Sequence, residues 1–260
     1  MITVSVITIC FNNLDELKQT ISSVDKQLTH PFEHIIIDGS SKTAIQTFLE
    51  TTPQPSYRKW VCERDNGIAD AFNKGIAKAK GDFVVMLNAG DIFYDEFAIQ
   101  KATEKLQSDN TIQWLHGEYE IKRANKWVII GKPFEAAKVY RGMRSLCHQS
   151  MFVRRSLHAQ YGEYSSDYKI AMDYDFVLRI AKEKSAFIEY PLVKFEPNGI
   201  SGTQYYASLA EAKKAYQKHY GFSIYLIFWQ LRLKLLYVLL HSPIGNLLYA
   251  IKAGLKMENV

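Results

Sequence analysis

The sequence predicts an α/β fold: a Rossmann-like, mostly parallel sheet flanked by helices, followed by a C-terminal helical extension. Two observations lead to this prediction. Short β-branched runs, such as those at 4–10 and 33–38, alternate four times with stretches whose apolar residues recur at helical spacing. The links between them are short, which is typical of parallel strands joined by crossover helices.

The first half of the chain gives the clearest pattern of elements. The run Val4–Cys10 (VSVITIC) predicts a buried strand, and residues 14–24 place apolar side chains three and four positions apart, which predicts a helix. The following elements alternate in the same way: a strand at 33–38, a helix at 42–50, and strands at 60–63 and 82–88 on either side of a helix at 67–80. Gly81 occupies the position of a C-cap glycine for that last helix.

Beyond residue 110 the pattern loosens into a mixed region. The expected elements are strands at 112–119, 127–130 and 187–190, a loop and strand within 141–153, helices at 173–182 and 204–219, and an apolar stretch at 222–257. We therefore divide the chain into a catalytic domain, 1–202, and a helical extension, 203–260. The catalytic domain has two halves, 1–110 and 111–202.

Composition excludes several classes of protein. The 260 residues are 47% hydrophobic and 23% charged, with a net charge of +5 and no long basic block, so nucleic-acid binding is not predicted. Three cysteines without CxxC spacing indicate neither a disulfide framework nor a zinc site. The first ten residues lack the features of a signal peptide, and no run of about 18 apolar residues occurs. We therefore expect a cytoplasmic protein.

Polar side chains follow the predicted parallel strands at the points where these end. Because the carboxyl ends of parallel strands meet at one edge, where ligands bind in such sheets, we expect a site there. Its candidate residues are Asn12, Asp38, Glu63, Asp65, Asn88 and Asp91. No GxGxxG follows the first strand, which disfavours a dehydrogenase. A nucleotidyltransferase is disfavoured because no Gly-rich basic loop stands near the N-terminus.

Five segments match one known family in the correct order over residues 4 to about 180. They are VSVITICFNN, IIIDGSS, ERDNGIADAFNKGIAKAKGDFVVMLNAGD, CHQSMFVRR and AMDYDFVLR. The chain resembles family 2 glycosyltransferases of the glycosyltransferase A fold, especially the colanic-acid-type and O-antigen-type members that build bacterial polysaccharides. The resemblance implies inverting transfer of a sugar, most commonly from a UDP-sugar, to a saccharide or a polyprenyl-diphosphate-linked acceptor.

The same resemblance implies a donor pocket in the first half. Asp38 would contact the nucleotide base, and Thr8 and Asn12 would line the same pocket. The sugar and diphosphate would meet a further group: Gly39, Glu63, Asp65, Gly67, Asp70, Asn73 and Lys74. Simpler accounts exist for some of these residues, because Asp-Gly-Ser-Ser suits helix capping and a solvated charged helix face explains Asp70 and Lys74.

Asn88-Ala89-Gly90-Asp91 stands where the family has its Asp-x-Asp motif. The resemblance implies that Asp91 binds Mn²⁺ or Mg²⁺ and that Asn88, Ala89 and Gly90 lie beside the donor. Hard cations take oxygen ligands, and Mg²⁺ commonly uses one or two carboxylates together with substrate phosphates. Asp91 is the one strong ligand left in this motif. A strand-end turn is the alternative explanation.

Asp173 is the candidate catalytic base by the same resemblance, since an inverting transfer needs a carboxylate to accept the acceptor's proton. Met172 replaces the acid often found before it, and a favourable helix-dipole position is the alternative explanation. Asp175 is expected to be structural and to pair with Arg179 four residues later. His148 and Gln149 are expected near the acceptor. The loop Gly199-Ile200-Ser201 resembles one that closes over the donor.

The C-terminal stretch leaves two alternatives open. Arg232 and Lys234 in the middle of residues 222–240 argue against a spanning helix. An interfacial helix on the inner face of the cytoplasmic membrane is one prediction, and helices packed on the catalytic domain or in a dimer interface are the other. A non-catalytic nucleotide-binding or scaffold protein is the rival function, supported by Asn88 and Met172 and opposed by the presence of both Asp91 and Asp173.

Overall fold

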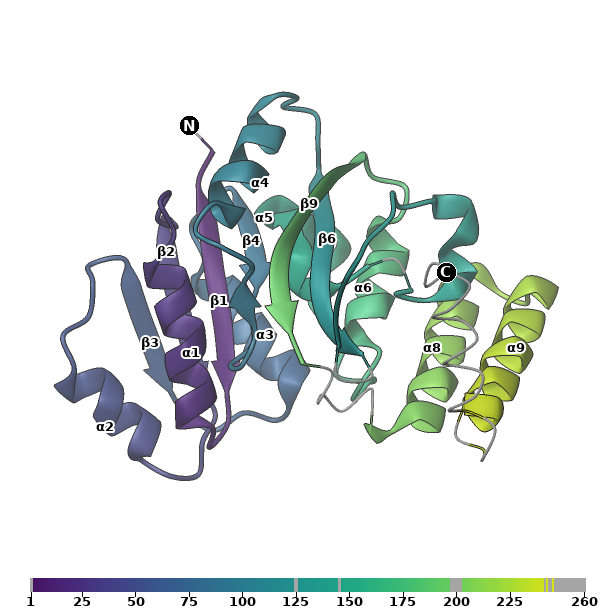
Figure 1. Ribbon diagram of the computed structural model, residues 1–260, viewed down its shortest axis with the longest axis horizontal. Coiled ribbons are helices and arrows are strands. Elements are labelled where there is room, and N and C mark those ends of the chain that lie inside the picture. The colour runs from purple at the N-terminus through teal and green to yellow at the C-terminus, as the bar shows by residue number, and fades with distance from the viewer. Residues whose placement is uncertain are drawn as a thin grey trace.

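The computed structural model describes residues 2–123, 126–144, 146–196 and 203–240, together with Ser242 and Gly245. These residues form a nine-stranded sheet with helices on both faces (Figure 1). The strand order is β3-β2-β1-β4-β8-β6-β9-β5, and β7 pairs with β6 outside this path. The strands are β1 (Val4–Cys10), β2 (Glu33–Asp38), β3 (Arg58–Cys62), β4 (Phe83–Met86), β5 (Ile92–Phe93), β6 (Trp114–Arg123), β7 (Lys126–Ile130), β8 (Met151–Arg154) and β9 (Ser185–Phe195).

The first four strands of this order are parallel, as predicted. The pairing places Cys10 beside Asp38, and Asp38 beside Cys62, so β1, β2 and β3 end side by side. Buried β-branched residues explain these strands, since parallel strands are covered on both faces. The carboxyl ends therefore form one rim, as expected.

The second half of the sheet is mixed, also as predicted. β8 runs antiparallel to both of its neighbours, β4 and β6. β6 is parallel to β9, and β7 folds back on β6 as an antiparallel partner. β8 therefore separates the parallel half from the half that we expected to bind the acceptor.

Two layers of helices bury the sheet. Their bounds are α1 (Leu14–Asp25), α2 (Ala44–Thr51), α3 (Ile68–Lys78), α4 (Ala98–Gln107), α5 (Arg155–Tyr161) and α6 (Met172–Ile180). Side chains of α3, α5 and α6 share one apolar core, whereas α1, α2 and α4 contribute to two cores on the other face. Two short 3-10 turns, η1 (Ala136–Arg141) and η2 (His148–Ser150), lead towards β8.

The end of α3 differs from the prediction. The helix ends at Lys78, its C-cap is Ala79, and Gly81 lies outside it. A Cβ added to Gly81 would lie 2.8 Å from the backbone nitrogen of Ser5, and the Gly81 N–H donates to the Ser5 hydroxyl at 3.0 Å. Gly81 is therefore required by close packing against β1, so its prediction as a C-cap glycine was wrong.

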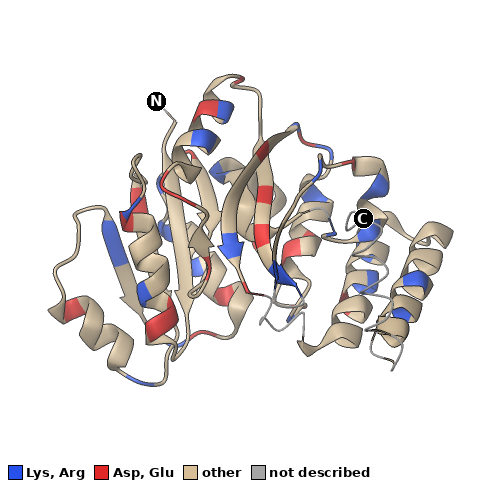
Figure 2. Ribbon diagram, in the orientation of Figure 1, with Lys and Arg blue, Asp and Glu red and all other residues tan. Residues whose placement is uncertain are grey.

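Two further helices, α8 (Tyr205–Tyr220) and α9 (Ile224–Leu240), form one end of the molecule in Figure 1. α8 packs on α6, and α9 packs beside η1. Within the described part of the chain, every helix is too short or too polar to cross a membrane. Figure 2 shows Lys and Arg along α9 but no acidic residue. The predicted loop at 198–202 and the chain from 246 onward lie outside the described residues.

Candidate active site

A cleft of about 950 Å³ lies between the rim of the parallel strands and the helices of the second half. It opens beside the carboxyl ends of β1 and β4, which are neighbouring parallel strands. Open α/β sheets bind ligands at such a point. Seven of the residues predicted from the sequence line it: Asn88, Ala89, Gly90, Asp91, His148, Gln149 and Asp173.

Asp91 is the buried acid of this cleft. Its side chain accepts a hydrogen bond from Nε2 of Gln149 at 3.0 Å. Burial raises the pKa of Asp91 above its ordinary value, and the bond from Gln149 opposes part of that shift. The Gln149 amide therefore supports the acid, in addition to lining the cleft where we expected an acceptor contact.

Thr20 of α1, which no local sequence pattern singles out, fixes the loop that carries Asp91. The buried hydroxyl of Thr20 donates to the carbonyl of Asp91 at 2.8 Å and accepts the N–H of Gly90 at 2.9 Å. Gly90 adopts φ +102°, a conformation that side chains rarely take. The loop is thus held by a helix about 70 positions earlier in the chain.

His148 connects this loop to the candidate base. Asn88 Nδ2 lies 3.2 Å from Nε2 of the imidazole, and Nδ1 lies 3.5 Å from Oδ2 of Asp173. Because the Asn88 amide nitrogen is a donor, Nε2 accepts and Nδ1 carries the proton of the neutral ring. That proton faces Asp173, whose other oxygen accepts the N–H of Tyr174 at 2.7 Å. Asp173 is partly exposed to the cleft.

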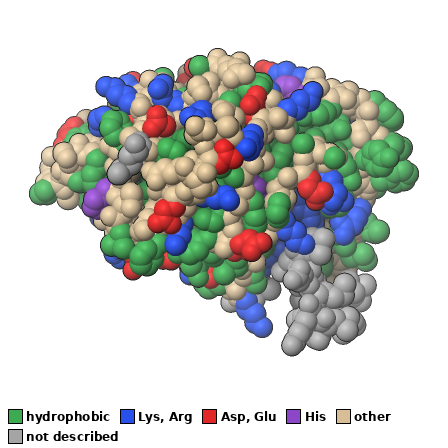
Figure 3. Space-filling model, turned by 90° about the horizontal axis from the view of Figure 1, so that it is seen from above, with side chains coloured by type: hydrophobic (Ala, Val, Ile, Leu, Met, Phe, Trp, Pro, Cys, Tyr) green, Lys and Arg blue, Asp and Glu red, His purple; other side chains and the backbone are tan. Residues whose placement is uncertain are grey.

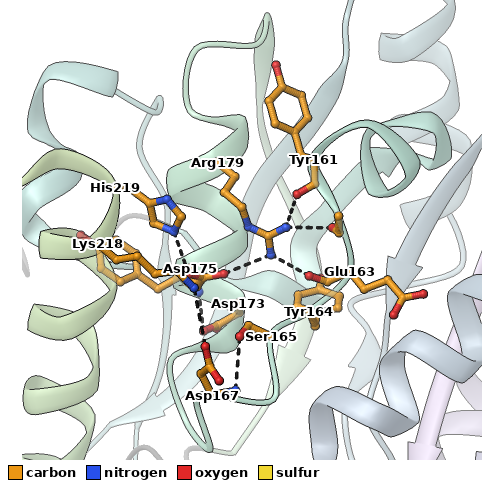
Figure 4. A network of polar contacts seen from close by, with 12 residues as sticks. Tyr161, Glu163, Tyr164, Ser165, Asp167, Asp173, Asp175, Arg179, Lys218 and His219 are labelled. Atoms are coloured by element: carbon orange, nitrogen blue, oxygen red, sulfur yellow. Dashed lines mark hydrogen bonds and ion pairs between the residues drawn. The ribbon is translucent and has the colours of Figure 1, made fainter.

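Asp175 has the structural role that we predicted. Figure 4 shows it between Arg179 and His219 of α8, with which it pairs at 3.1 and 2.8 Å. Arg179 also donates to the carbonyl oxygens of Gly162 and Glu163, at 2.9 and 2.8 Å. The buried carboxylate therefore ties α6 to α8 and to the loop after α5.

Glu211 of α8 supports α6 from its other end. Its carboxylate accepts the N–H groups of Lys169, Ile170 and Ala171 at 3.2, 2.8 and 3.0 Å. These three bonds lower the pKa of Glu211. The segment that leads into Asp173 is therefore held by a charge-assisted contact from the C-terminal extension.

The donor groups around Asp91 fit a hard cation that shares its ligands with a substrate. Oδ1 of Asn88 is buried and lacks a hydrogen-bond partner in the described structure. It offers a second oxygen near the Asp91 carboxylate. Among the residues that the structure describes, no group of three or more His, Cys, Asp or Glu side chains is arranged to hold a metal ion by itself. An ion here would need further oxygen ligands, such as those of a diphosphate.

At the rim, Asp38 and Asn12 shape the loop that follows β2. Asp38 is 3% exposed and accepts the N–H of Ser40 at 3.0 Å. Asn12 adopts φ +56°, its N–H donates to the Ser40 hydroxyl at 2.7 Å, and its Oδ1 accepts the N–H of Lys42 at 3.2 Å. Thr8 lies below the rim, is 0% exposed, and bonds His34 Nε2 at 2.9 Å. Its side chain is therefore buried within the sheet, where it contacts β2.

Lys74 gathers the predicted acidic residues into one cluster. Its Nζ lies 2.8 Å from Asp65, 3.1 Å from Glu63 and 3.5 Å from Asp70. These carboxylates, chiefly Asp65, raise the pKa of Lys74. Gly39 belongs to the same cluster, because a Cβ there would lie 2.1 Å from Oδ2 of Asp65. Lys74 is therefore paired with three acids in this structure.

Asn73 and Gly67 serve the local structure of α3. The side-chain amide of Asn73 donates to the carbonyl of Tyr164 and accepts the N–H of the same residue, both at 2.9 Å. Gly67, the N-cap of α3, has φ +119°. Asp70 accepts the N–H of Asn66 at 2.8 Å just before the helix, and that bond contributes most to its lowered pKa. These contacts fix the start of α3 beside the carboxyl ends of the parallel strands.

Phe11 is a rim residue that our sequence analysis did not single out. It follows β1 directly and is 64% exposed. An aromatic ring held at a strand end presents a flat apolar face, which suits stacking on a nucleotide base. The sequence signal for this residue was an aromatic side chain between the end of the predicted strand and two asparagines.

Comparisons with known proteins identify the family of the chain. The family profile described as glycosyl transferase family 2 matches residues 5–162. An uncharacterized glycosyltransferase of Mycobacterium tuberculosis is 35% identical over 201 residues, covering 76% of each chain. A PGL/p-HBAD biosynthesis glycosyltransferase of Mycobacterium bovis is 24% identical and covers 72% of each.

Solved structures share the fold. A fragment of TarS from S. aureus in complex with UDP-GlcNAc has a TM-score of 0.61 at 13% identity, over 84% of this chain and 67% of that one. The mannosyltransferase PcManGT from Pyrobaculum calidifontis, in complex with GDP-Man and Mn²⁺, also has a TM-score of 0.61, at 16% identity, over 99% and 81%. The chain belongs to glycosyl transferase family 2 and has the glycosyltransferase A fold.

Proposed function

We propose that this chain transfers a sugar from a nucleotide-diphosphate sugar to an acceptor hydroxyl with inversion of the anomeric carbon. One observation carries the proposal: Asp173 and the Asp91 loop line the same cleft and are connected through His148. The acceptor oxygen attacks the anomeric carbon and its proton passes to Asp173. The bond to the diphosphate breaks, and its electron pair leaves with the nucleoside diphosphate.

His148 is a positioning residue in this scheme. Its neutral ring directs a proton from Nδ1 towards one oxygen of Asp173, and the Tyr174 N–H binds the other. The carboxylate is thereby held with one face towards the cleft. A base fixed before the substrate arrives loses little entropy when it accepts a proton.

The donor side uses the rim of the parallel strands. Phe11 offers a ring for stacking and Asp38 an acceptor for a base N–H, and a UDP-sugar is the donor that we propose. Asp91 and Oδ1 of Asn88 would hold Mn²⁺ or Mg²⁺ together with diphosphate oxygens. When bound, such an ion offsets the charge that develops on the leaving diphosphate.

The acceptor that we propose is a lipid-linked saccharide of bacterial surface polysaccharide synthesis, met at the inner face of the cytoplasmic membrane. The open cleft has room for a saccharide, and α9 presents exposed apolar side chains beside it. These features support the proposal, as does the relative that takes part in PGL/p-HBAD biosynthesis.

The first test is calorimetry with UDP, GDP, dTDP and CDP, each with and without Mn²⁺. We expect one of them, UDP, to bind in a metal-dependent way. Asp173→Asn should keep that affinity but slow release of the nucleoside diphosphate from the donor by roughly 100-fold or more. Asp167→Asn, an exposed acid nearby, is the matched control and should keep both. If no nucleotide binds the folded protein, the non-catalytic scaffold function replaces this proposal.

A further inference from the structure

Three arginine side chains surround one tryptophan at the end of the cleft. The guanidinium carbons of Arg141, Arg144 and Arg232 lie 5.3, 5.2 and 4.9 Å from the ring centroid of Trp229. Arg141 and Arg144 come from η1 and the segment after it, whereas Trp229 and Arg232 belong to α9. We call these four residues the arginine cluster.

The arginine cluster holds positive charge without acidic partners. Within the described part of the chain, none of its three guanidinium groups forms an ion pair with a carboxylate, and the buried Nε of Arg141 lacks a hydrogen-bond partner. Burial and the neighbouring charges of Arg232, Arg123 and Arg141 lower the pKa of Arg144. Like charges so close together are unfavourable unless an anion binds among them.

Two members of the cluster line the same cleft as the candidate base. Arg141 and Trp229 line that cleft together with Asp173. The indole N–H of Trp229 donates to the carbonyl of Arg141 at 3.2 Å, which fixes α9 against η1. A molecule with its hydroxyl at Asp173 and an anionic group farther along the cleft would therefore reach the arginines.

An apolar stripe continues from this point along the outer side of α9. Its members recur at helical spacing and are 47 to 65% exposed; they are Ile224, Phe228, Leu231, Leu235 and Val238. Figure 3 shows hydrophobic side chains gathered at this end of the molecule, with Lys and Arg side chains beside them. An anion site next to an exposed apolar stripe matches an amphiphile whose polar head is anionic.

We propose that the arginine cluster binds the diphosphate of a lipid-linked acceptor, with the lipid chain lying on the apolar stripe of α9. Bidentate guanidinium contacts suit phosphate oxygens, and the Trp229 ring holds the guanidiniums in a fixed arrangement. The proposal rests on the proposed function only in calling the bound molecule an acceptor. Binding itself needs neither donor nor turnover.

The test measures binding of farnesyl diphosphate to the full chain by calorimetry without nucleotide. Arg144→Ala with Arg232→Ala should weaken binding about tenfold or more, because two charge-assisted contacts are lost. Lys234→Ala, an exposed cation two positions along α9, is the matched control and should bind as the wild type does. Farnesol, which has the same chain without the charge, should bind far more weakly than the diphosphate.

Three results would overturn the proposal: equal affinity in the double variant and the wild type, equal binding of farnesol and farnesyl diphosphate, or no binding of farnesyl diphosphate. Vesicles of phosphatidylglycerol distinguish the source of phosphate. If these alone bind through the arginines, the cluster recognises a bilayer headgroup and the acceptor assignment is wrong. Binding of UDP to the same protein, measured in parallel, separates the two proposals. If UDP does not bind but farnesyl diphosphate does, only the proposed function is contradicted.

Discussion

Gln149 donates a hydrogen bond to Oδ2 of Asp91 at 3.0 Å, across 58 positions of the chain. The contact joins the turn before β8 to the loop after β4, so it fixes the buried acid from the second half of the sheet. The other end of the same amide accepts from the Cys147 thiol. Asp91, the metal ligand that we propose, is therefore held by residues that lie both before and after position 110.

Gln149→Ala should lower the free energy of unfolding by about 1–3 kcal/mol, because it leaves a buried carboxyl oxygen of Asp91 without its hydrogen-bond donor. Urea denaturation measures this. In an Asp91→Asn background the same substitution should cost clearly less, which gives a coupling energy for the pair. Equal costs in the two backgrounds would show that the contact contributes nothing.

Asp91→Asn should stabilise the metal-free protein at neutral pH while weakening metal-dependent nucleotide binding. Burial raises the pKa of Asp91, so the native state binds this proton more tightly than the unfolded state does. Wild-type stability therefore falls as pH rises from about 4, near the unfolded pKa, through the raised native pKa. The variant lacks this loss, and its relative stability should increase over that interval.

Thermal unfolding in EDTA from about pH 2 to 8 measures this trend on both sides of the unfolded pKa of an aspartate. Asp82→Asn is a control of opposite sign. The N–H of Thr3 lowers the pKa of Asp82, so this group stabilises the native state above its unfolded pKa. Asp82→Asn should therefore lose relative stability as pH rises. A parallel pH dependence in the two variants would contradict the assignment for Asp91.

Thr20→Val should lower the free energy of unfolding by about 1–3 kcal/mol, since it removes the hydrogen bond to the buried carbonyl of Asp91 and leaves the N–H of Gly90 with only its bond to the Glu16 carbonyl. It should also weaken metal-dependent nucleotide binding, because the loop loses its support. Thr103→Val is the matched control. The Thr103 hydroxyl is also buried in a helix, but it bonds only carbonyls of that helix. Similar results for both variants would contradict a specific role for Thr20.

Asn73→Ala separates a structural role from a donor contact. The substitution removes both hydrogen bonds to the Tyr164 backbone, so unfolding should become easier by about 1–3 kcal/mol. Nucleotide affinity, measured by calorimetry below the melting temperature, should stay unchanged. A selective loss of donor binding with normal stability would restore the donor role that the family resemblance implied.

The regular elements were predictable from the sequence because their signals are local. The β-branched run of β1 and the apolar spacing of α1 depend on neighbouring residues, and both elements formed as expected. The pairing of Asp175 with Arg179 was equally predictable, since it lies within one helical turn. The rim also followed from strand order, because parallel strands bring their carboxyl ends together.

Other parts of the site depend on contacts between distant residues, which no local pattern contains. Asn73 bonds a residue 91 positions later, and the Thr20 hydroxyl meets a carbonyl 71 positions later. Gly81 had the sequence context of a C-cap glycine, but packing against β1 explains it better. The arginine cluster combines residues near η1 with residues of α9, and these two segments are far apart in the sequence and meet only in the folded structure.

Glu211 has a consequence for how this enzyme can be altered or diversified. α8 binds the three N–H groups ahead of the helix that carries Asp173. The border that we drew at residue 202 therefore divides the sequence but does not divide the structure into independent domains. A chimera that takes its last two helices from a relative would also need a carboxylate for residues 169–171. The surface of α9 that we propose binds the acceptor and the helix α6 that carries the proposed base would therefore have to be exchanged together.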